Sequence, residues 1–280
     1  MLIRIDGRDA YAYTGGRPFD ASRPTVVFIH GAQHDHSVWI LQSRWFAHHG
    51  WSVLALDLPG HGRSGGAPLP TVEAMAGWTL AFLDAAGVAR ARLVGHSMGS
   101  LIALEAAGQA PARVAAVALV GTAFPMRVSE QLLEAARTDE SLAFDLINGW
   151  SHSGINHSPG CPGPGFSVFV QNRRLMERQK PGTLLNDFSA CNAYAGGAAR
   201  AAALTCPALV VLGTRDVMTP PKAARALAST IPGTEVVEIA GAGHALMSER
   251  PDAVLDALRG FLGDAVQAAA RSAEGAAASA

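Results

Sequence analysis

The segment GHSMG, Gly95–Gly99, restricts the fold more than any other part of this chain. It follows Ala91–His96, an apolar run typical of a strand, and it opens Ser97–Gln109, which is typical of a helix. A strand that turns directly into a helix at a serine strains the backbone there. It also crowds the positions two before and two after, so that glycine is needed at both. A simple glycine-rich turn with Ser97 as a helix cap is the alternative, but a strand before and a helix after favour the strained turn.

Short apolar runs alternate with helical segments along most of the chain. The strand-like runs are Thr25–His30, Trp51–Asp57, Ala91–His96, Val114–Val120, Ala208–Gly213 and Thr234–Ala240. The helical segments are Ser37–His49, Thr71–Ala86, Ser97–Gln109, Pro220–Thr230 and Ala253–Leu262. This alternation predicts an α/β fold with a mostly parallel, doubly wound sheet, because parallel strands need helical crossovers. The first ~15 residues alternate around Gly7 and predict an antiparallel hairpin at the edge of the sheet.

The alternation is interrupted once, between about residues 124 and 205, where several helical stretches replace the strands. We therefore expect a core domain formed by residues 1–123 and 206–266, with residues 124–205 inserted as a helical cap. Residues 267–280 are rich in alanine and low in bulky side chains, which predicts a flexible C-terminal tail.

Composition excludes several classes of function. The chain has 280 residues, 49% of them hydrophobic, and a formal net charge of -1. A nucleic-acid partner is not expected, because such proteins usually carry a basic face. A membrane partner is not expected either, because no apolar run of about 18 residues is present and the N-terminus lacks a signal peptide. We expect a cytoplasmic monomer or homodimer that acts on a small molecule.

The three cysteines do not form a metal or disulfide pattern. No two have the CxxC spacing of zinc sites, and an odd number gives no disulfide framework. We expect ordinary thiols, with a Cys161–Cys191 bridge left open, and no metal site.

Two further residues complete a catalytic arrangement around Ser97. A serine hydroxyl is a weak nucleophile and needs a base that a third group orients. Asp216 comes just after the run Ala208–Gly213, and His244 follows the last strand-like run; such strand ends meet at one edge of a parallel sheet. Taken alone, Asp216 fits a helix-capping carboxylate and His244 an exposed loop histidine. Their joint order and position predict Ser97 as nucleophile, His244 as base and Asp216 as the orienting acid.

The segment HGAQ, His30–Gln33, predicts the second half of the site. Acyl transfer develops negative charge on a carbonyl oxygen, and fixed N–H donors stabilise that charge. The backbone N–H groups of Ala32 and Met98 are the expected donors, although HGAQ alone also fits a plain turn at a strand end. Four apolar residues are candidates for a substrate pocket, with the interior of the cap as the alternative place for the aromatic ones. They are Phe124, Trp150, Phe166 and Met247; Phe169 and Phe188 of the inserted segment are further aromatic candidates with the same alternative.

These segments together resemble the α/β-hydrolase superfamily, in particular its small bacterial serine esterases. The matching segments are His30–Trp39, Asp57–Ser64, Gly95–Ser100, Leu212–Pro220 and Gly241–Pro251, in the order of the family. The resemblance covers most of the chain except about residues 124–205, which have no specific match. It implies an eight-stranded sheet, no cofactor and an acyl-enzyme intermediate.

The expected activity is hydrolysis of a carboxylic ester or thioester of a small, largely apolar substrate. The alternative enzyme activity is that of a carbon–carbon bond hydrolase or a lactonase that uses the same three catalytic residues. Carbon–carbon bond hydrolases of this fold commonly carry Asn before the serine and Trp after the histidine, where this chain has His96 and Ala245. A ligand-binding receptor or pseudoenzyme on the same fold is the alternative from another class.

Overall fold

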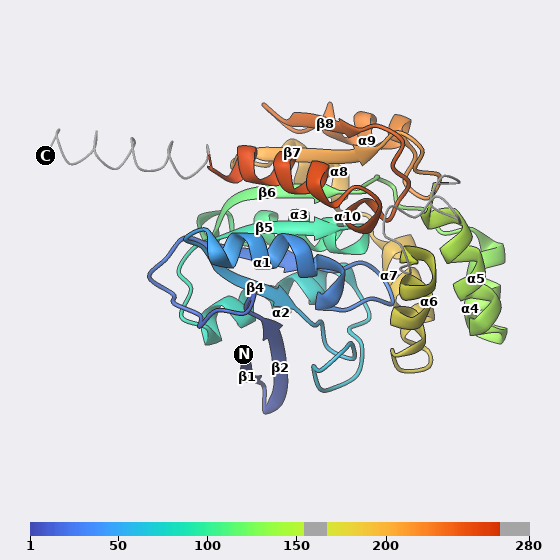
Figure 1. Ribbon diagram of the computed structural model, residues 1–280, viewed down its shortest axis with the longest axis horizontal. Coiled ribbons are helices and arrows are strands. Elements are labelled where there is room, and N and C mark those ends of the chain that lie inside the picture. The colour runs from blue at the N-terminus through green and yellow to red at the C-terminus, as the bar shows by residue number, and fades with distance from the viewer. Residues whose placement is uncertain (154–166, 264–280) are drawn as a thin grey trace, which may run out of the picture.

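An eight-stranded sheet forms the centre of the computed structural model, which describes residues 1–153 and 167–263 (Figure 1). The strand order is β1-β2-β4-β3-β5-β6-β7-β8. The strands are β1 Leu2–Ile5, β2 Arg8–Tyr13, β3 Thr25–Ile29, β4 Ser52–Leu56, β5 Ala91–His96, β6 Val114–Val120, β7 Ala208–Gly213 and β8 Glu235–Ile239. β1 and β2 pair antiparallel at one edge, and β3 to β8 run parallel. The predicted hairpin and the mostly parallel, doubly wound sheet are thus confirmed.

Helices cover both faces of this sheet, as a parallel sheet with apolar strands requires. Every residue of β3, β4, β5 and β7 is buried. α2 and α3 lie over one face and share an apolar core with α9, while α1, α10 and the helical residues 251–263 pack on the other. The bounds are η1 His36–Trp39, α1 Ile40–His48, α2 Val72–Ala85, α3 Met98–Gln109, η2 Pro111–Arg113, α9 Pro221–Ala228 and α10 Leu246–Glu249.

Among the described residues between β6 and β7 there are five further helices. They are α4 Glu130–Thr138, α5 Glu140–Ser151, α6 Val168–Glu177, α7 Thr183–Ala193 and α8 Gly197–Ala202. Figure 1 shows α4 to α7 together beyond one end of the sheet, and they share an apolar cluster that includes Leu132, Phe144, Met176 and Leu184. α8 instead packs beside the sheet on α3, where Arg200 forms an ion pair of 2.9 Å with Glu105. The extent of the cap, 124–205, stays a prediction.

Some expectations fall on residues outside the described ranges. These are the pocket candidate Phe166, the cysteine Cys161 and the C-terminal tail 267–280. Cys191 is a buried free thiol, and Cys206 is a half-buried one. Within residues 1–153 and 167–263, none of the helices has the length and apolar character needed to cross a membrane.

Replacing Phe28 in β3 is expected to destabilise the fold. Its fully buried ring packs on Trp39 and Phe46, with centroids 5.2 and 5.9 Å away. Phe28→Ala removes these contacts and leaves a cavity, which costs about 3–5 kcal/mol of unfolding free energy. Urea unfolding followed by circular dichroism measures this change. Leu2→Ala on the edge strand, where the side chain is 59% exposed, is the control and should change stability little. A loss below about 1 kcal/mol in Phe28→Ala would contradict the packing described here.

Candidate active site

Ser97 sits at the strained turn that the sequence predicts. It joins β5 to α3 with φ +51° and ψ −120°, a backbone conformation that residues other than glycine rarely adopt. A Cβ atom added to Gly95 would lie 2.0 Å from the Gly99 carbonyl oxygen, and one added to Gly99 would lie 2.4 Å from the Ile29 oxygen. Glycine is therefore required at both positions, because the first turn of α3 packs directly on the ends of β3 and β5.

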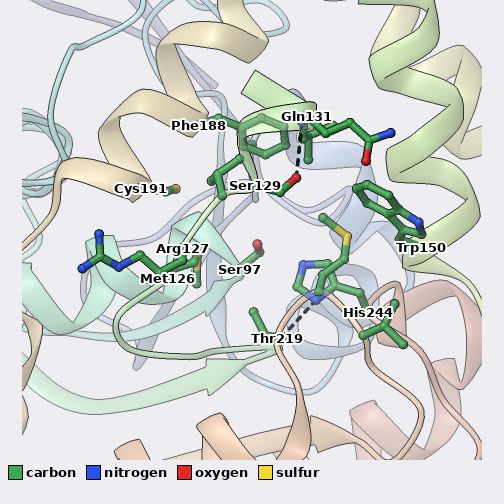
Figure 2. Close-up of a pocket in the computed structure, with 15 residues that line it drawn as sticks. Ser97, Met126, Arg127, Ser129, Gln131, Trp150, Phe188, Cys191, Thr219 and His244 are labelled. Carbon is green, nitrogen blue, oxygen red and sulfur yellow. Dashed lines mark hydrogen bonds between the residues drawn. The ribbon is translucent and has the colours of Figure 1, made fainter. Parts of the chain in front are cut away.

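A cavity of about 440 Å³ opens above this turn. Both Ser97 and His244 line it, and Figure 2 shows the Ser97 hydroxyl pointing into the space between Ser129 and the imidazole of His244. Arg127 points away from Ser97 in the same view. Among the described residues no hydrogen bond joins Ser97 Oγ to His244 Nε2; such contacts are often long without substrate and tighten when substrate binds.

His244 is held by the carboxylate of Asp216. The loop after β8 supplies His244, the loop after β7 supplies Asp216, and His244 Nδ1 lies 2.8 Å from Asp216 Oδ2. This hydrogen bond places the proton on Nδ1 and leaves Nε2 as the basic nitrogen. The sequence therefore predicts correctly that these two side chains meet at the carboxyl ends of the strands.

The Asp216 carboxylate is kept charged by several donors. Its Oδ1 accepts the backbone N–H groups of Met218 and Thr219, both at 2.8 Å. Its Oδ2 accepts the Thr219 hydroxyl at 2.6 Å, and this hydroxyl also lies 3.1 Å from His244 Nδ1 (Figure 2). Burial alone would raise the pKa of Asp216, but the charge and hydrogen bond of His244 and the donors of Thr219 outweigh it and lower the pKa. Sequence analysis did not identify Thr219, although it stands three residues after Asp216.

The two expected oxyanion donors lie on either side of the Ser97 turn. Met98 is the first residue of α3, where backbone N–H groups lack partners within the helix. Ala32 follows β3 and lines the same cavity as Ser97. Within the described residues, the Ala32 N–H donates to no protein acceptor. Both donors are thus available to a bound group.

A buried carboxylate of the inserted helices holds the loop that carries Ala32. Asp187 of α7 is fully buried, and its Oδ2 accepts the backbone N–H of Gln33 at 2.9 Å. The same oxygen lies 2.9 Å from Nε2 of His61, which follows β4. Gln33 has a positive φ of 57°, so the peptide next to Ala32 is held in an unusual conformation by this contact. The sequence contains no local signal for Asp187, because its partners are far apart along the chain.

Two buried histidines near the site are neutral. Burial lowers the pKa of His30 to about 4, and its Nδ1 donates to the Gly31 carbonyl while Nε2 accepts from Leu58. Burial also lowers the pKa of His96 well below its ordinary value; its Nε2 donates to the backbone oxygen of His244 at 2.9 Å. His30 and His96 are therefore neutral and support the loops around the site.

The predicted pocket residues lie in different places. Trp150 lines the cavity beside Ser97, and Met247 lines a second cavity on another side of His244. Phe124 is not among the residues that line these two cavities: its ring packs edge-on against Tyr194 at 5.8 Å, because the chain turns toward α8 there, and its place in a substrate pocket stays a prediction. Phe188, another aromatic candidate, lines the cavity beside Ser97. The rest of the apolar wall comes mainly from residues that the sequence did not identify as its lining: Met126, Val128, Leu132, Cys191 and Met218.

Asp35, His36 and Asp57 form a cluster whose ligand-type atoms lie within 4.8 Å of one another. Their oxygens already have protein donors. Asp57 accepts from the backbone and the imidazole of His36 at 2.8 Å each and from the Arg63 N–H at 2.8 Å, and Asp35 accepts from Ser37. We interpret the cluster as support for the loops after β3 and β4.

Comparison with known proteins agrees with this geometry. The sequence model of the family described as alpha/beta hydrolase fold matches residues 24–251. RutD of Klebsiella pneumoniae subsp. pneumoniae, named as a candidate carbamate hydrolase, is 30% identical over 237 residues, which cover 79% of this chain and 85% of that protein. A pimeloyl-acyl-carrier-protein methyl ester esterase of Chromobacterium violaceum is 29% identical over 79% of this chain and 87% of its own.

Solved structures give the same result. The enol-lactonase from Burkholderia xenovorans LB400 superposes with a TM-score of 0.81 at 27% identity, covering 94% of this chain and all of that one. Sheet order, serine turn and strand-end loops define a hydrolase of the α/β class. The chain belongs to the alpha/beta hydrolase fold family.

Removing the Thr219 hydroxyl is expected to weaken the reactivity of Ser97. Thr219→Val takes one donor from Asp216, and hydrogen bonds to charged groups are worth about 1.5–3 kcal/mol. The second-order rate at which a fluorophosphonate labels Ser97 should therefore fall by about tenfold or more. Thr219→Ser keeps the hydroxyl and is the matched control. Equal labelling rates in Thr219→Val and the parent would contradict a role of the Thr219 hydroxyl in the reactivity of Ser97.

The His61–Asp187 pair predicts a pH dependence of stability. Burial acts to lower the pKa of His61, but the Asp187 charge and hydrogen bond outweigh it, so the pKa is raised above 6.5. The pair's contribution is full below about pH 6.5 and is lost as the pH rises through the folded-state pKa. Between pH 6 and 9 the unfolding free energy of the parent should therefore fall more steeply than that of Asp187→Asn. Urea unfolding at several pH values measures both slopes, and identical slopes would contradict the assignment.

Proposed function

We propose that this chain is a serine hydrolase that cleaves the carboxylic ester or thioester bond of a small, largely apolar substrate. The observation that carries the proposal is the hydrogen bond of 2.8 Å between His244 Nδ1 and Asp216, with His244 and Ser97 lining one cavity. This arrangement supplies a nucleophile, a base with a free Nε2 and a buried carboxylate that stabilises the protonated imidazole.

The reaction follows from the positions of these groups. His244 Nε2 takes the proton of Ser97 as Oγ attacks the carbonyl carbon, and the N–H groups of Ala32 and Met98 stabilise the oxyanion. The protonated imidazole gives its proton to the leaving oxygen or sulfur, and an acyl-enzyme remains on Ser97. Water then attacks the acyl carbon while His244 accepts its proton, which returns to Ser97 as the acid leaves.

The shape and polarity of the cavity support an apolar acyl group. Leu132, Phe188 and Met126 are nearly fully buried in its wall, and burial raises the pKa of the Cys191 thiol, which is therefore uncharged. Esterase and lactonase names among the similar proteins agree with acyl transfer. A lactone or a carbamate passes through the same tetrahedral intermediate, so these substrates belong in the test.

The test compares the parent with Ser97→Ala on nitrophenyl esters of increasing acyl length, a lactone and a carbamate. Removing the nucleophile should lower kcat by about 10⁴-fold or more, because residues of a triad act as a unit. Ser229→Ala, at the exposed residue directly after α9, is the matched control and should keep the parent rate. If the two enzymes hydrolysed the esters equally fast, the assignment of Ser97 would fail. Labelling of Ser97 without turnover of any substrate would favour a receptor.

A further inference from the structure

A second cavity of about 600 Å³ lies on another side of His244. It is enclosed by η1 and the start of α1, by α6, and by the segment from His244 into α10. His244 lines both cavities, whereas Ser97 and Ala32 line the first and not the second. His244 is therefore the residue that the two cavities share.

The wall of the second cavity is largely apolar and partly open to solvent. Its apolar residues include Val38, Ile40, Leu41, Val168, Val170 and Leu175, besides Ala245 and Met247. Of the seven large apolar side chains that are exposed in the described ranges, three belong to this wall: Ile40, Leu41 at 55% and Val170 at 54%. Such a group of exposed apolar side chains next to a cavity is typical of a ligand site.

The charged groups of the second cavity are already paired. Arg174 forms an ion pair of 2.7 Å with Glu177, and Arg178 forms one of 2.7 Å with Asp35. Burial lowers the pKa of His34 to about 4, so its ring is neutral. The cavity thus fits a neutral apolar group better than a carboxylate or a phosphate.

We propose that the second cavity holds the leaving alcohol or thiol of the substrate, while the first cavity holds the acyl group. This inference rests on the proposed function. After attack by Ser97 Oγ, the bond from the carbonyl carbon to the leaving atom breaks, and that atom takes the proton from His244 Nε2. The leaving group must therefore reach His244, which lines the second cavity, whereas the acyl group stays on Ser97 in the first.

The assignment names a substrate class. The substrate is an open-chain ester or thioester with an apolar group on each side of the bond. A small lactone keeps its leaving oxygen tethered to the acyl chain, so it fills one cavity and leaves the other unused. Once the alcohol departs, the second cavity lets water reach His244 for the deacylation step.

A crossed experiment on the full chain tests the two cavities separately. Val170→Trp fills the second cavity from an exposed position, and Leu41→Trp fills it from the facing wall. Val128→Trp, at a half-buried position of the first cavity, is the matched variant. The probes are acetate esters with alcohols from ethyl to octyl, and ethyl esters with acids from acetate to octanoate. A pH-stat measures kcat/KM for each pair.

Filling the second cavity should lower kcat/KM for octyl acetate by about tenfold or more, and leave ethyl octanoate within about twofold, since lost apolar contacts cost factors of this size. Val128→Trp should give the reverse pattern. Equal effects of all variants on both series, or a reversed pattern, would overturn the assignment. If the parent cleaves neither series, the proposed function itself fails, and that result is distinct from a parent that cleaves both without a crossed pattern. Thermal unfolding of each variant separates loss of fold from loss of binding.

Discussion

The close contact between the first turn of α3 and the ends of β3 and β5 is the constraint on which the site depends. Gly95 and Gly99 leave no room for a side chain, and this contact forces Ser97 to a φ of +51°. The strain is stabilised by the fully buried strands around it, because a helix that packs this closely cannot relax without opening the sheet. The same contact aims the hydroxyl and the helix N-terminus at one point, so the proposed nucleophile and the proposed oxyanion donor share a single structural cause.

The inserted helices are linked to this site by two buried carboxylates. Asp187 of α7 accepts the N–H of Gln33, next to Ala32. Glu249 of α10 accepts the N–H of Gly243, next to His244, and the N–H of Ser153, which lies two residues after α5. Each carboxylate therefore fixes a peptide beside a candidate site residue and at the same time binds the inserted helices or the residues that follow them. The packing of these helices and the geometry of the site are thus coupled through buried hydrogen bonds.

The position of His244 between two cavities connects this geometry with specificity. The imidazole of His244 is fixed by Asp216 and Thr219. The backbone oxygen of His244 accepts a hydrogen bond from His96. Substrate groups can then approach from the Ser97 side and from the α6 side. The walls of both cavities contain residues of the inserted helices, so changes in these helices alter the choice of substrate while the sheet keeps the reacting groups in place.

The sequence by itself determined the sheet, the strained turn and the residue types at the strand ends. These are local properties: a buried strand, a glycine beside a crowded backbone and a serine at a helix start leave direct patterns in the chain. That Ser97, Asp216 and His244 lie at one edge of the sheet also follows from the sequence, since parallel strands bring their carboxyl ends together. Only the tertiary structure decided that Phe124 packs toward α8 and that Asp187 holds the loop of Ala32. It also decided that a second cavity opens beside His244, because these features depend on how helices far apart in the chain pack against each other.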